Sequence, residues 1–202
     1  LFYNIGMRII AGSARGRKLL SVPKDSVVRP ISGRIKQSLF DIIRPRLPGS
    51  RFLDLFAGTG AVGMEALSRL AEAVVFVERD KLCVSVIEKN LARAGWTGKA
   101  RVLRASALGP LSWIPFRSGT SRFDLIFMGP PYKDGDKKPL FYCRSVLESV
   151  VSSGILAEDG WVIAQHHQNE DPAAPAGLKR FRVERYGDSR LSFYHKPPPP
   201  AA

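Results

Sequence analysis

Short apolar runs alternate with helical patterns from residue 51 onward. The runs RFLDLF at 51–56 and AVVFVE at 73–78 have the length and residue types of buried strands. Residues 61–70 and 80–94 follow them with apolar side chains at helical spacing. Because strands that alternate with helices pack into a parallel sheet, the pattern predicts a doubly wound α/β domain.

The alternation continues toward the end of the chain. Strands are expected at residues 100–105, 123–128 and 160–166, a helix at 139–153, and a closing antiparallel pair at 180–187 and 190–195. The predicted fold is therefore a Rossmann-like, mostly parallel twisted sheet with an antiparallel last strand.

Length and composition limit the remaining possibilities. The 202 residues, 45% of them apolar, suffice for one α/β domain and a small appendage. No apolar run approaches the ~20 residues of a membrane span, and the start lacks a secretory signal pattern, so we expect a cytoplasmic protein. Cys83 and Cys143 are expected to be buried free thiols. No Cys/His cluster has metal-ligand spacing, so no metal is expected.

Positive charge is concentrated at the start of the chain. Residues 1–51 hold eleven Lys and Arg and two acidic residues, hence +9 of the formal charge of +13. A basic segment beside a near-neutral domain is typical of a contact with a polyanion such as RNA. A solvated basic face is the alternative, and an anionic membrane is disfavoured because no clean amphipathic helix is present.

The chain divides into four segments. Residues 1–6 are expected to be disordered or a misassigned start. Residues 7–48 form a basic extension, with a β-hairpin at 7–22 and a helix that Ser32 caps and Pro45 ends. Residues 49–195 form the main domain, and residues 196–202 a disordered Pro-rich tail.

A glycine-rich loop follows the first strand. Gly58, Gly60 and Gly63 match G-x-G-x-x-G, and Glu78 ends the next strand, where it can bind a ribose diol. These residues alone also fit a nicotinamide or flavin enzyme. Asp54, however, would repel a pyrophosphate and suits a cationic amino group, such as that of S-adenosylmethionine.

A second loop, Gly129-Pro-Pro-Tyr132, follows the strand at 123–128. Its prolines fix the backbone and remove N–H donors, so carbonyl acceptors remain. Carbonyl oxygens can accept hydrogen bonds from an –NH₂ group, and Tyr132 can stack on a flat base. The loop therefore favours chemistry at the exocyclic amine of a base.

Together these stretches resemble the bacterial 16S rRNA (guanine-N2)-methyltransferase family. The matching segments are MRIIAG, RGRKL, RPISGRIKQSLF (29–40), DLFAGTGAVGMEALSR (54–69), FVERD (76–80), Lys-Asn-Leu (89–91) and FDLIFMGPPY (123–132). They span residues 7–195. The resemblance implies a class I methyltransferase fold, S-adenosylmethionine as donor with S-adenosylhomocysteine as product, and guanine N2 of small-subunit rRNA as acceptor.

The resemblance and local chemistry together assign roles to residues. Asp54 would face the cofactor's amino group through water, Glu78 would accept from the ribose hydroxyls, and Ser106 would contact the adenine amine. The expected cofactor-binding residues are Asp54, Phe56, Ala57, Gly58, Thr59, Gly60, Glu78, Arg79, Ser106 and Ala107. The expected catalytic residues are Gly129, Pro130, Pro131 and Tyr132, and the expected RNA contacts are Arg15, Arg17, Lys18, Arg29, Arg34 and Lys36.

Gly129 departs from the family pattern, which places Asp, or Asn in related enzymes, before Pro-Pro-Tyr or Pro-Pro-Phe. That side chain accepts a hydrogen bond from the target amine and orients its lone pair. We expect activity to survive at reduced rate through the carbonyls of Gly129 and Pro130 and through Tyr132. Asp124 is expected to be a structural acid. For Arg34, the alternative to RNA contact is an ion pair with an acid of the main domain.

Three functions remain open. The first is methylation of guanine N2 by a monomer, on small-subunit rRNA or an assembling subunit and without a membrane. The second is methylation of adenine N6 in DNA or RNA, because Pro-Pro-Tyr loops also serve that chemistry; the small size and single basic extension argue against it. The third is an RNA-binding homologue with catalysis weakened at Gly129.

Overall fold

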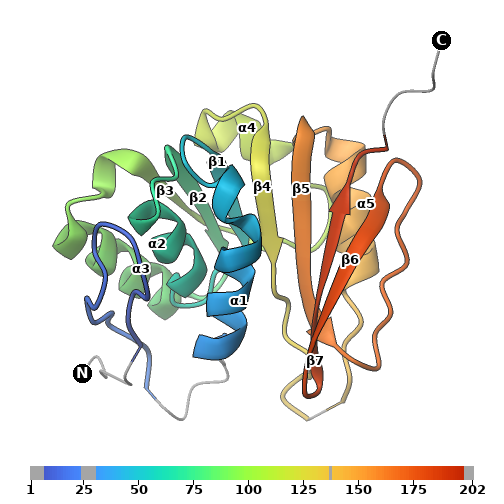
Figure 1. Ribbon diagram of the computed structural model, residues 1–202, viewed down its shortest axis with the longest axis horizontal. Coiled ribbons are helices and arrows are strands. Elements are labelled where there is room, and N and C mark those ends of the chain that lie inside the picture. The colour runs from blue at the N-terminus through green and yellow to red at the C-terminus, as the bar shows by residue number, and fades with distance from the viewer. Residues whose placement is uncertain (1–6, 24–30, 137, 198–202) are drawn as a thin grey trace.

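The computed structural model describes residues 7–23, 31–136 and 138–197. Its strands are β1 (Arg51–Leu55), β2 (Ala73–Glu78), β3 (Ala100–Arg104), β4 (Phe123–Met128), β5 (Leu156–His167), β6 (Lys179–Tyr186) and β7 (Ser189–His195). They form a seven-stranded sheet in the order β3-β2-β1-β4-β5-β7-β6 (Figure 1). Strands β1 to β5 are parallel, and β7 lies antiparallel between β5 and β6. The predicted Rossmann-like sheet is confirmed.

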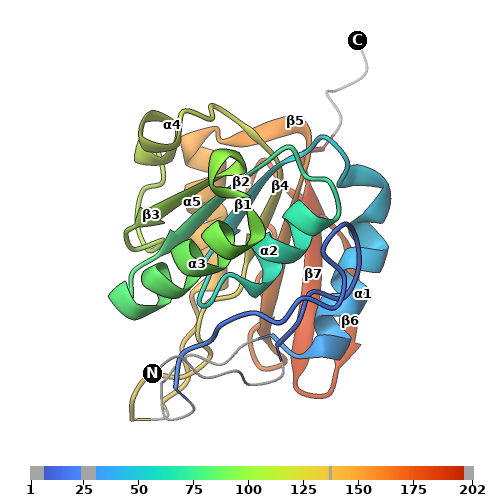
Figure 2. The same ribbon diagram turned by 90° about the vertical axis from the view of Figure 1, so that its left-hand side faces the viewer.

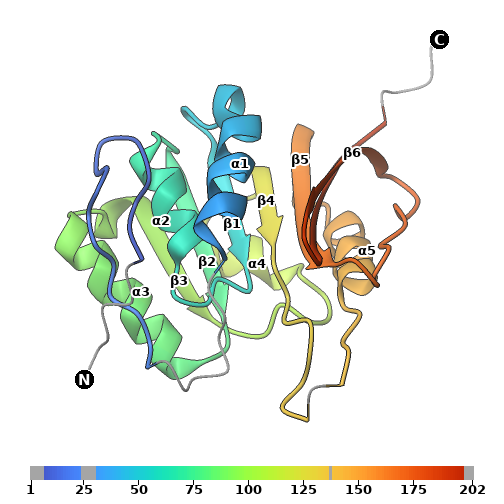
Figure 3. The same ribbon diagram turned by 60° about the horizontal axis from the view of Figure 1, so that its bottom comes forward.

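Helices cover both faces of this sheet. They are α1 (Gly33–Ile43), α2 (Ala61–Ser68), α3 (Lys81–Ala94), α4 (Trp113–Ser118) and α5 (Cys143–Ser153), with short 3₁₀ turns at Arg44–Arg46 and Thr97–Lys99. Helices α1, α2 and α3 pack on one face, and α4 and α5 pack on the other (Figure 3). The described residues contain no helix long and apolar enough to cross a membrane.

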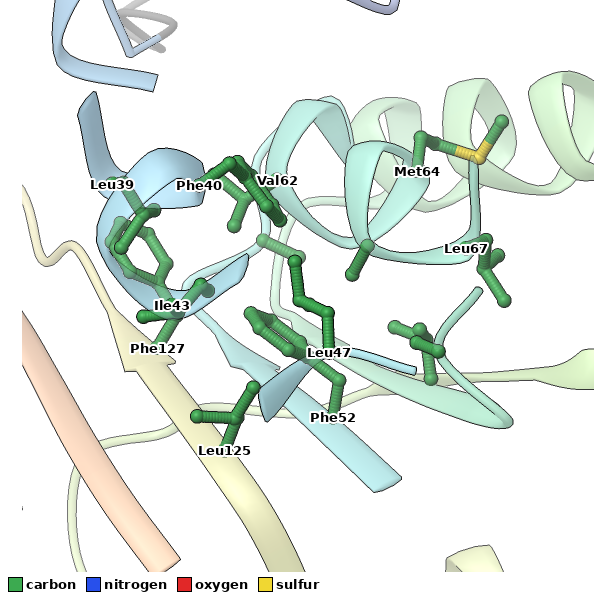
Figure 4. Close-up of a cluster of buried hydrophobic side chains, with 14 of the residues drawn as sticks. Leu39, Phe40, Ile43, Leu47, Phe52, Val62, Met64, Leu67, Leu125 and Phe127 are labelled. Atoms are coloured by element: carbon green, nitrogen blue, oxygen red, sulfur yellow. The ribbon is translucent and has the colours of Figure 1, made fainter. Parts of the chain in front are cut away.

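Helix α1 joins the basic extension to the main core. The Ser32 side chain accepts a hydrogen bond from the Ile35 N–H and caps the helix, as predicted. Its buried stripe, Ile35, Leu39, Phe40 and Ile43, lies over the sheet. Figure 4 shows this cluster of α1, α2 and sheet side chains, with labels on Leu39, Phe40, Ile43, Leu47, Phe52, Val62, Met64, Leu67, Leu125 and Phe127.

The segment 7–23 crosses α2 and α3 (Figure 2). It folds back on itself through one antiparallel bridge, Arg8 with Lys18, and hydrogen bonds such as that from the Ile9 N–H to the Arg17 carbonyl at 3.0 Å. Gly12 has φ +87°, and a Cβ there would lie 1.9 Å from the Ser68 carbonyl oxygen. Glycine is therefore required where this segment meets α2.

The structure differs from the sequence prediction chiefly in one unexpected helix and in the starts of two other elements. Helix α4 was not expected, because it is only six residues long and contains Pro115. Helix α5 begins at Cys143 rather than 139, because Pro139 forms an antiparallel bridge with Lys133 and the Leu140 N–H donates to the Tyr132 carbonyl, which keeps these residues out of the helix. Strand β5 begins earlier, at Leu156, through a register shift against β4. The predictions for residues 1–6 and for 198–202 of the tail fall outside the described residues.

Candidate functional site

Strand register brings the two predicted loops together. Leu55 at the end of β1 pairs with Val77 of β2 on one side and Met128 of β4 on the other. The glycine loop after β1, Glu78 at the end of β2 and the Gly129–Tyr132 loop after β4 therefore share the carboxyl edge of the sheet. Open α/β sheets bind their ligands at this edge.

Asp54 lies beneath the glycine loop. Its Oδ2 accepts the Gly63 N–H at 2.9 Å, whereas its Oδ1 is buried and has no hydrogen-bond partner among the described residues. Burial raises the pKa of Asp54 to about 7, the Gly63 hydrogen bond opposes this, and nearby Glu78 adds to it. An acceptor left unpaired in the protein interior is costly, so this oxygen suits a donor brought by a ligand.

Glu78 also contacts the glycine loop directly. Its Oε2 accepts the Gly58 N–H at 2.7 Å, and its Oε1 accepts the Asp80 N–H at 2.8 Å. Because a carboxylate offers about four lone-pair sites, both oxygens keep acceptor capacity for hydroxyl groups. The two backbone contacts fix the position of the carboxylate.

Two glycines set the geometry of the loop. Gly60 caps α2 with φ +81°. A Cβ on Gly63 would lie 2.2 Å from Cε1 of the Phe76 ring, so α2 approaches β2 only because residue 63 has no side chain. The loop therefore presents backbone to a ligand at short range. The Thr59 hydroxyl donates to Met7 Sδ at 3.6 Å, which places the N-terminal segment beside the loop.

The other expected cofactor residues take varied positions. Phe56 is half-buried with φ +62°, and Ala57 is buried. Arg79 is exposed after Glu78, and Ala107 is buried beyond β3. Ser106 is exposed, and its Oγ accepts the Leu108 N–H at 3.1 Å in a local turn. The second lone pair of that hydroxyl remains for a ligand.

The Gly129–Tyr132 loop is anchored by residues that the sequence did not indicate. The Tyr132 hydroxyl accepts from Gln165 Nε2 at 2.9 Å and donates to Ser189 Oγ at 3.4 Å. The His167 ring meets the Tyr132 ring edge-on, with centroids 5.9 Å apart. Burial raises the pKa of Tyr132. Gln165 and Ser189 come from β5 and β7, and their sequence signal is weak because both strands carry other polar residues.

Lys36, expected to contact RNA, lies elsewhere. It is 3% exposed, its Nζ donates to the Arg8 carbonyl at 2.9 Å, and it pairs with Glu65 Oε2 at 3.1 Å. A buried, paired ammonium cannot reach a phosphate, so the expectation for Lys36 is corrected: it holds the basic extension to the domain.

Glu65 is the centre of that attachment and was missed from the sequence. Its oxygens accept the Ile10 N–H at 2.8 Å, the Ala11 N–H at 2.9 Å and Arg69 Nε at 2.9 Å, in addition to Lys36. Burial alone would raise the pKa of Glu65, but these partners lower it. The carboxylate therefore links the N-terminal segment, α1 and α2.

The remaining basic residues are at the surface. Arg15, Arg17, Lys18 and Arg34 are exposed, although Arg17 Nη1 also donates to the Arg93 carbonyl at 2.6 Å. Among the described residues, Arg34 forms no ion pair, so the proposed acid partner is not seen. Arg29 lies outside the described residues. Asp124 is structural, as expected, because it binds Arg51 through Nε and Nη2 at 3.0 Å each.

An open groove of about 1060 Å³ runs between α1 and β6. Arg34 and Arg44 line one wall, and Arg182 and Tyr186 line the other. Tyr186 pairs with Ser189 across the β6–β7 turn, and Ser189 contacts Tyr132. Ser189 therefore stands between the groove and the Gly129–Tyr132 loop, which does not itself line the groove.

Cys83 and Cys143 are free and buried, as predicted. Burial raises the pKa of the Cys83 thiol to about 12 and raises that of Cys143 further, so neither is a reactive nucleophile. In the described part of the chain, no group of three His, Cys, Asp or Glu side chains could hold a metal ion.

Comparison with known proteins gives matches over nearly the whole chain. The model of the family "Conserved hypothetical protein 95" matches residues 7–195. The chain is 37% identical over 191 residues to YlbH of Bacillus subtilis strain 168, whose name marks it as a proposed rRNA methyltransferase; the match covers 94% of this chain and 99% of YlbH.

Two further matches agree. The chain is 31% identical over 197 residues to the "Ribosomal RNA small subunit methyltransferase D" of Escherichia coli K12, which covers 94% of this chain and 90% of that protein. The solved structure of the hypothetical protein TTHA0928 of Thermus thermophilus superposes with a TM-score of 0.73 at 32% identity, over 93% of this chain and 98% of the other.

Proposed function

The chain belongs to the Conserved hypothetical protein 95 family, and we propose that it methylates the exocyclic N2 amine of a guanine in small-subunit rRNA, with S-adenosylmethionine as donor. One observation carries the proposal beyond the family. The buried, unpaired carboxylate oxygen of Asp54 and the acceptor-rich Pro-Pro-Tyr loop lie at the ends of the neighbouring strands β1 and β4, at one edge of the sheet. The carboxylate oxygen suits the cationic amino group of the cofactor, and the loop suits the amine of a base.

The residues present fit S-adenosylmethionine. Asp54 Oδ1 offers an unpaired acceptor for the amino group, Glu78 keeps acceptor sites for the ribose hydroxyls, and Ala57 to Gly60 bring backbone close to the methionine part. Ser106 and Ala107 would border the adenine. When bound, the cofactor supplies an activated methyl group on a sulfonium.

The Gly129–Tyr132 loop would hold the acceptor base. The Gly129 and Pro130 carbonyls would accept from the amine, while Tyr132, fixed by Gln165 and Ser189, would stack on the ring. A guanine amine is conjugated with its ring and is a poor nucleophile, so its orientation matters.

The absence of a side chain at position 129 would lower the rate of methyl transfer. A charge-assisted hydrogen bond is worth about 1.5–3 kcal/mol, so its loss from the transition state slows transfer about ten- to a hundredfold. An added Cβ on Gly129 would lie 3.4 Å from Phe127 Cε1, which is ordinary contact. Gly129→Asp should therefore fit and should increase turnover.

RNA would be held by the basic extension and the adjoining groove. Arg15, Arg17, Lys18 and Arg34 are exposed, and Arg34, Arg44, Arg182 and Arg185 line the adjoining groove together with Asp41 and Glu184. Such arginines contact phosphates and position RNA without reading its sequence. We propose residues 7–48 as the RNA-contacting extension and 49–195 as the methyltransferase domain, acting as a cytoplasmic monomer on rRNA or an assembling subunit.

The test uses labelled S-adenosylmethionine and small subunits that lack the modification. Label recovered in N2-methylguanine supports the proposal, and digestion then maps the guanosine that received it. Label in adenine, or in DNA only, would refute it in favour of an adenine methyltransferase. RNA and cofactor binding without transfer, with transfer restored by Gly129→Asp, would instead identify a homologue that lost catalysis at Gly129.

A further inference from the structure

The space beside Gly129 is bordered by an amide oxygen. An ideal Cβ on Gly129 would lie 3.8 Å from Gln165 Oε1, nearly as close as the Phe127 ring. The register explains this proximity, because Met128 of β4 pairs with Ala164 of β5, and Gly129 and Gln165 follow them. A polar atom of β5 thus stands next to the place where a longer side chain at position 129 would extend.

The hydrogen bonds of Tyr132 favour the Gln165 orientation in which the carbonyl end of the amide faces Gly129. The Tyr132 hydroxyl has one hydrogen, which it donates to Ser189 Oγ. Its lone pair therefore accepts from Gln165 Nε2, at 2.9 Å. With the NH₂ group held at Tyr132, the carbonyl end of the amide is directed to Gly129.

We propose that Gln165 Oε1 is the hydrogen-bond acceptor that replaces the absent side chain of residue 129 and orients the target amine. This rests on the proposed function. An amide oxygen is the acceptor that an Asn at position 129 would supply, here delivered from β5. In the transfer the amine lone pair forms the N–C bond, the C–S electrons remain on sulfur, and the amine proton passes to solvent, while Gln165 stays a neutral amide.

Two substitutions separate the acceptor from the rest of the side chain. Gln165→Met keeps length but removes both polar ends, and it should lower kcat about three- to tenfold, since the bond is neutral. Its Kd for S-adenosylmethionine, measured by calorimetry, should stay within about twofold. Gln165→Glu keeps an oxygen toward the amine, and its other oxygen can accept from the Tyr132 hydroxyl in place of the lost Nε2 donation, so it should retain most of kcat. Gln168→Ala, at an exposed glutamine three residues further on, is the control.

Binding of the base gives a readout that does not depend on turnover. The probes are the rRNA fragment carrying the guanosine that takes up label, and the same fragment with inosine there, which lacks the amine. Wild type and Gln165→Glu should bind the guanosine fragment about three- to tenfold more tightly than the inosine fragment. Gln165→Met should bind both equally.

Gly129→Asp tests whether Gln165 acts only by holding Tyr132. If the two positions share one acceptor role, Gly129→Asp should raise kcat more in the Gln165→Met background than in wild type, and it should restore discrimination against inosine there. Equal gains in both backgrounds, or a Gln165→Met variant with unchanged kcat and discrimination, would overturn the proposal. An inactive wild type with an active Gly129→Asp would overturn it too, yet leave the family reaction standing. No N2-methylguanine from either protein would refute the proposed function itself.

Discussion

Removal of the Glu65 carboxylate should release the N-terminal segment and destabilise the whole domain. Glu65 is 0% exposed and is the shared partner of the Ile10 and Ala11 N–H groups, Lys36 and Arg69. In Glu65→Ala these donors lose their acceptor, while Lys36, itself 3% exposed, remains in the interior.

The magnitude follows from these contacts. Breaking a buried ion pair by removing one partner costs about 3–5 kcal/mol, because the other charge stays uncompensated. Each orphaned N–H would add about 1–3 kcal/mol if it stayed buried. The segment 7–23 can detach and hydrate those groups, which limits the total. We therefore expect the free energy of unfolding to fall by about 3–5 kcal/mol.

Urea unfolding at pH 7 measures the total, and amide hydrogen exchange locates it. The Ile10 and Ala11 amides should lose protection before the sheet does. Lys36→Met should relieve part of the damage in the Glu65→Ala background, because it removes the uncompensated ammonium. Glu148→Ala, which breaks an exposed pair with Arg144, is the control and should change stability by less than about 1 kcal/mol.

A loss below about 1 kcal/mol for Glu65→Ala, with Ile10 and Ala11 still protected, would refute the reasoning. So would strict additivity with Lys36→Met, since coupled partners of one buried site do not act independently.

Three further outcomes follow. Gly63→Ala should cost about 1–3 kcal/mol in urea unfolding, because its Cβ would meet the Phe76 ring at 2.2 Å. Asp54, with its pKa raised to about 7, is mostly protonated at pH 6 and mostly ionised at pH 8. The affinity of wild type for S-adenosylmethionine, divided by that of the Asp54→Asn variant, should therefore rise up to about tenfold from pH 6 to pH 8. Calorimetric affinity ratios that are equal at the two pH values would contradict this. Because the pKa of Glu65 is lowered in the folded state, its ionised form stabilises the fold above roughly pH 4.3, and this stabilisation is lost as the pH falls below that value. Glu65→Gln should therefore flatten the decline in unfolding free energy below about pH 4.3.

The sheet and most helices could be predicted because their signals are local. Strand β2 and the Ser32 cap of α1 agree with the sequence pattern residue for residue, since apolar runs and capping side chains act within a few positions. Asp54 and Glu78 also lie near the ends of β1 and β2 as expected, because loop motifs have fixed spacing, and their contacts with a cofactor stay a prediction.

Long-range contacts could not be predicted in the same way. The role of Lys36 was wrong because its partner, Glu65, lies on another helix, 29 positions further along the chain. Gln165 and Ser189 were missed because only the β4–β5–β7 register brings them to Tyr132. The sequence alone does not indicate whether a basic residue will form a buried ion pair with an acid from another element.

Strand β6 ends the sheet with an unpaired edge, and such edges are where separate molecules join into aggregates. Here the edge carries Lys179, Arg180, Arg182 and Arg185, and its register against β7 shifts between Arg180 and Arg182. Two copies meeting edge to edge would oppose like charges on strands whose hydrogen-bonding groups do not align. We therefore expect the basic side chains of β6 to disfavour edge-to-edge pairing, although Arg180 and Arg182 also pair with Asp171 and Glu184. Concentrated salt, which screens charge repulsion, should weaken that protection.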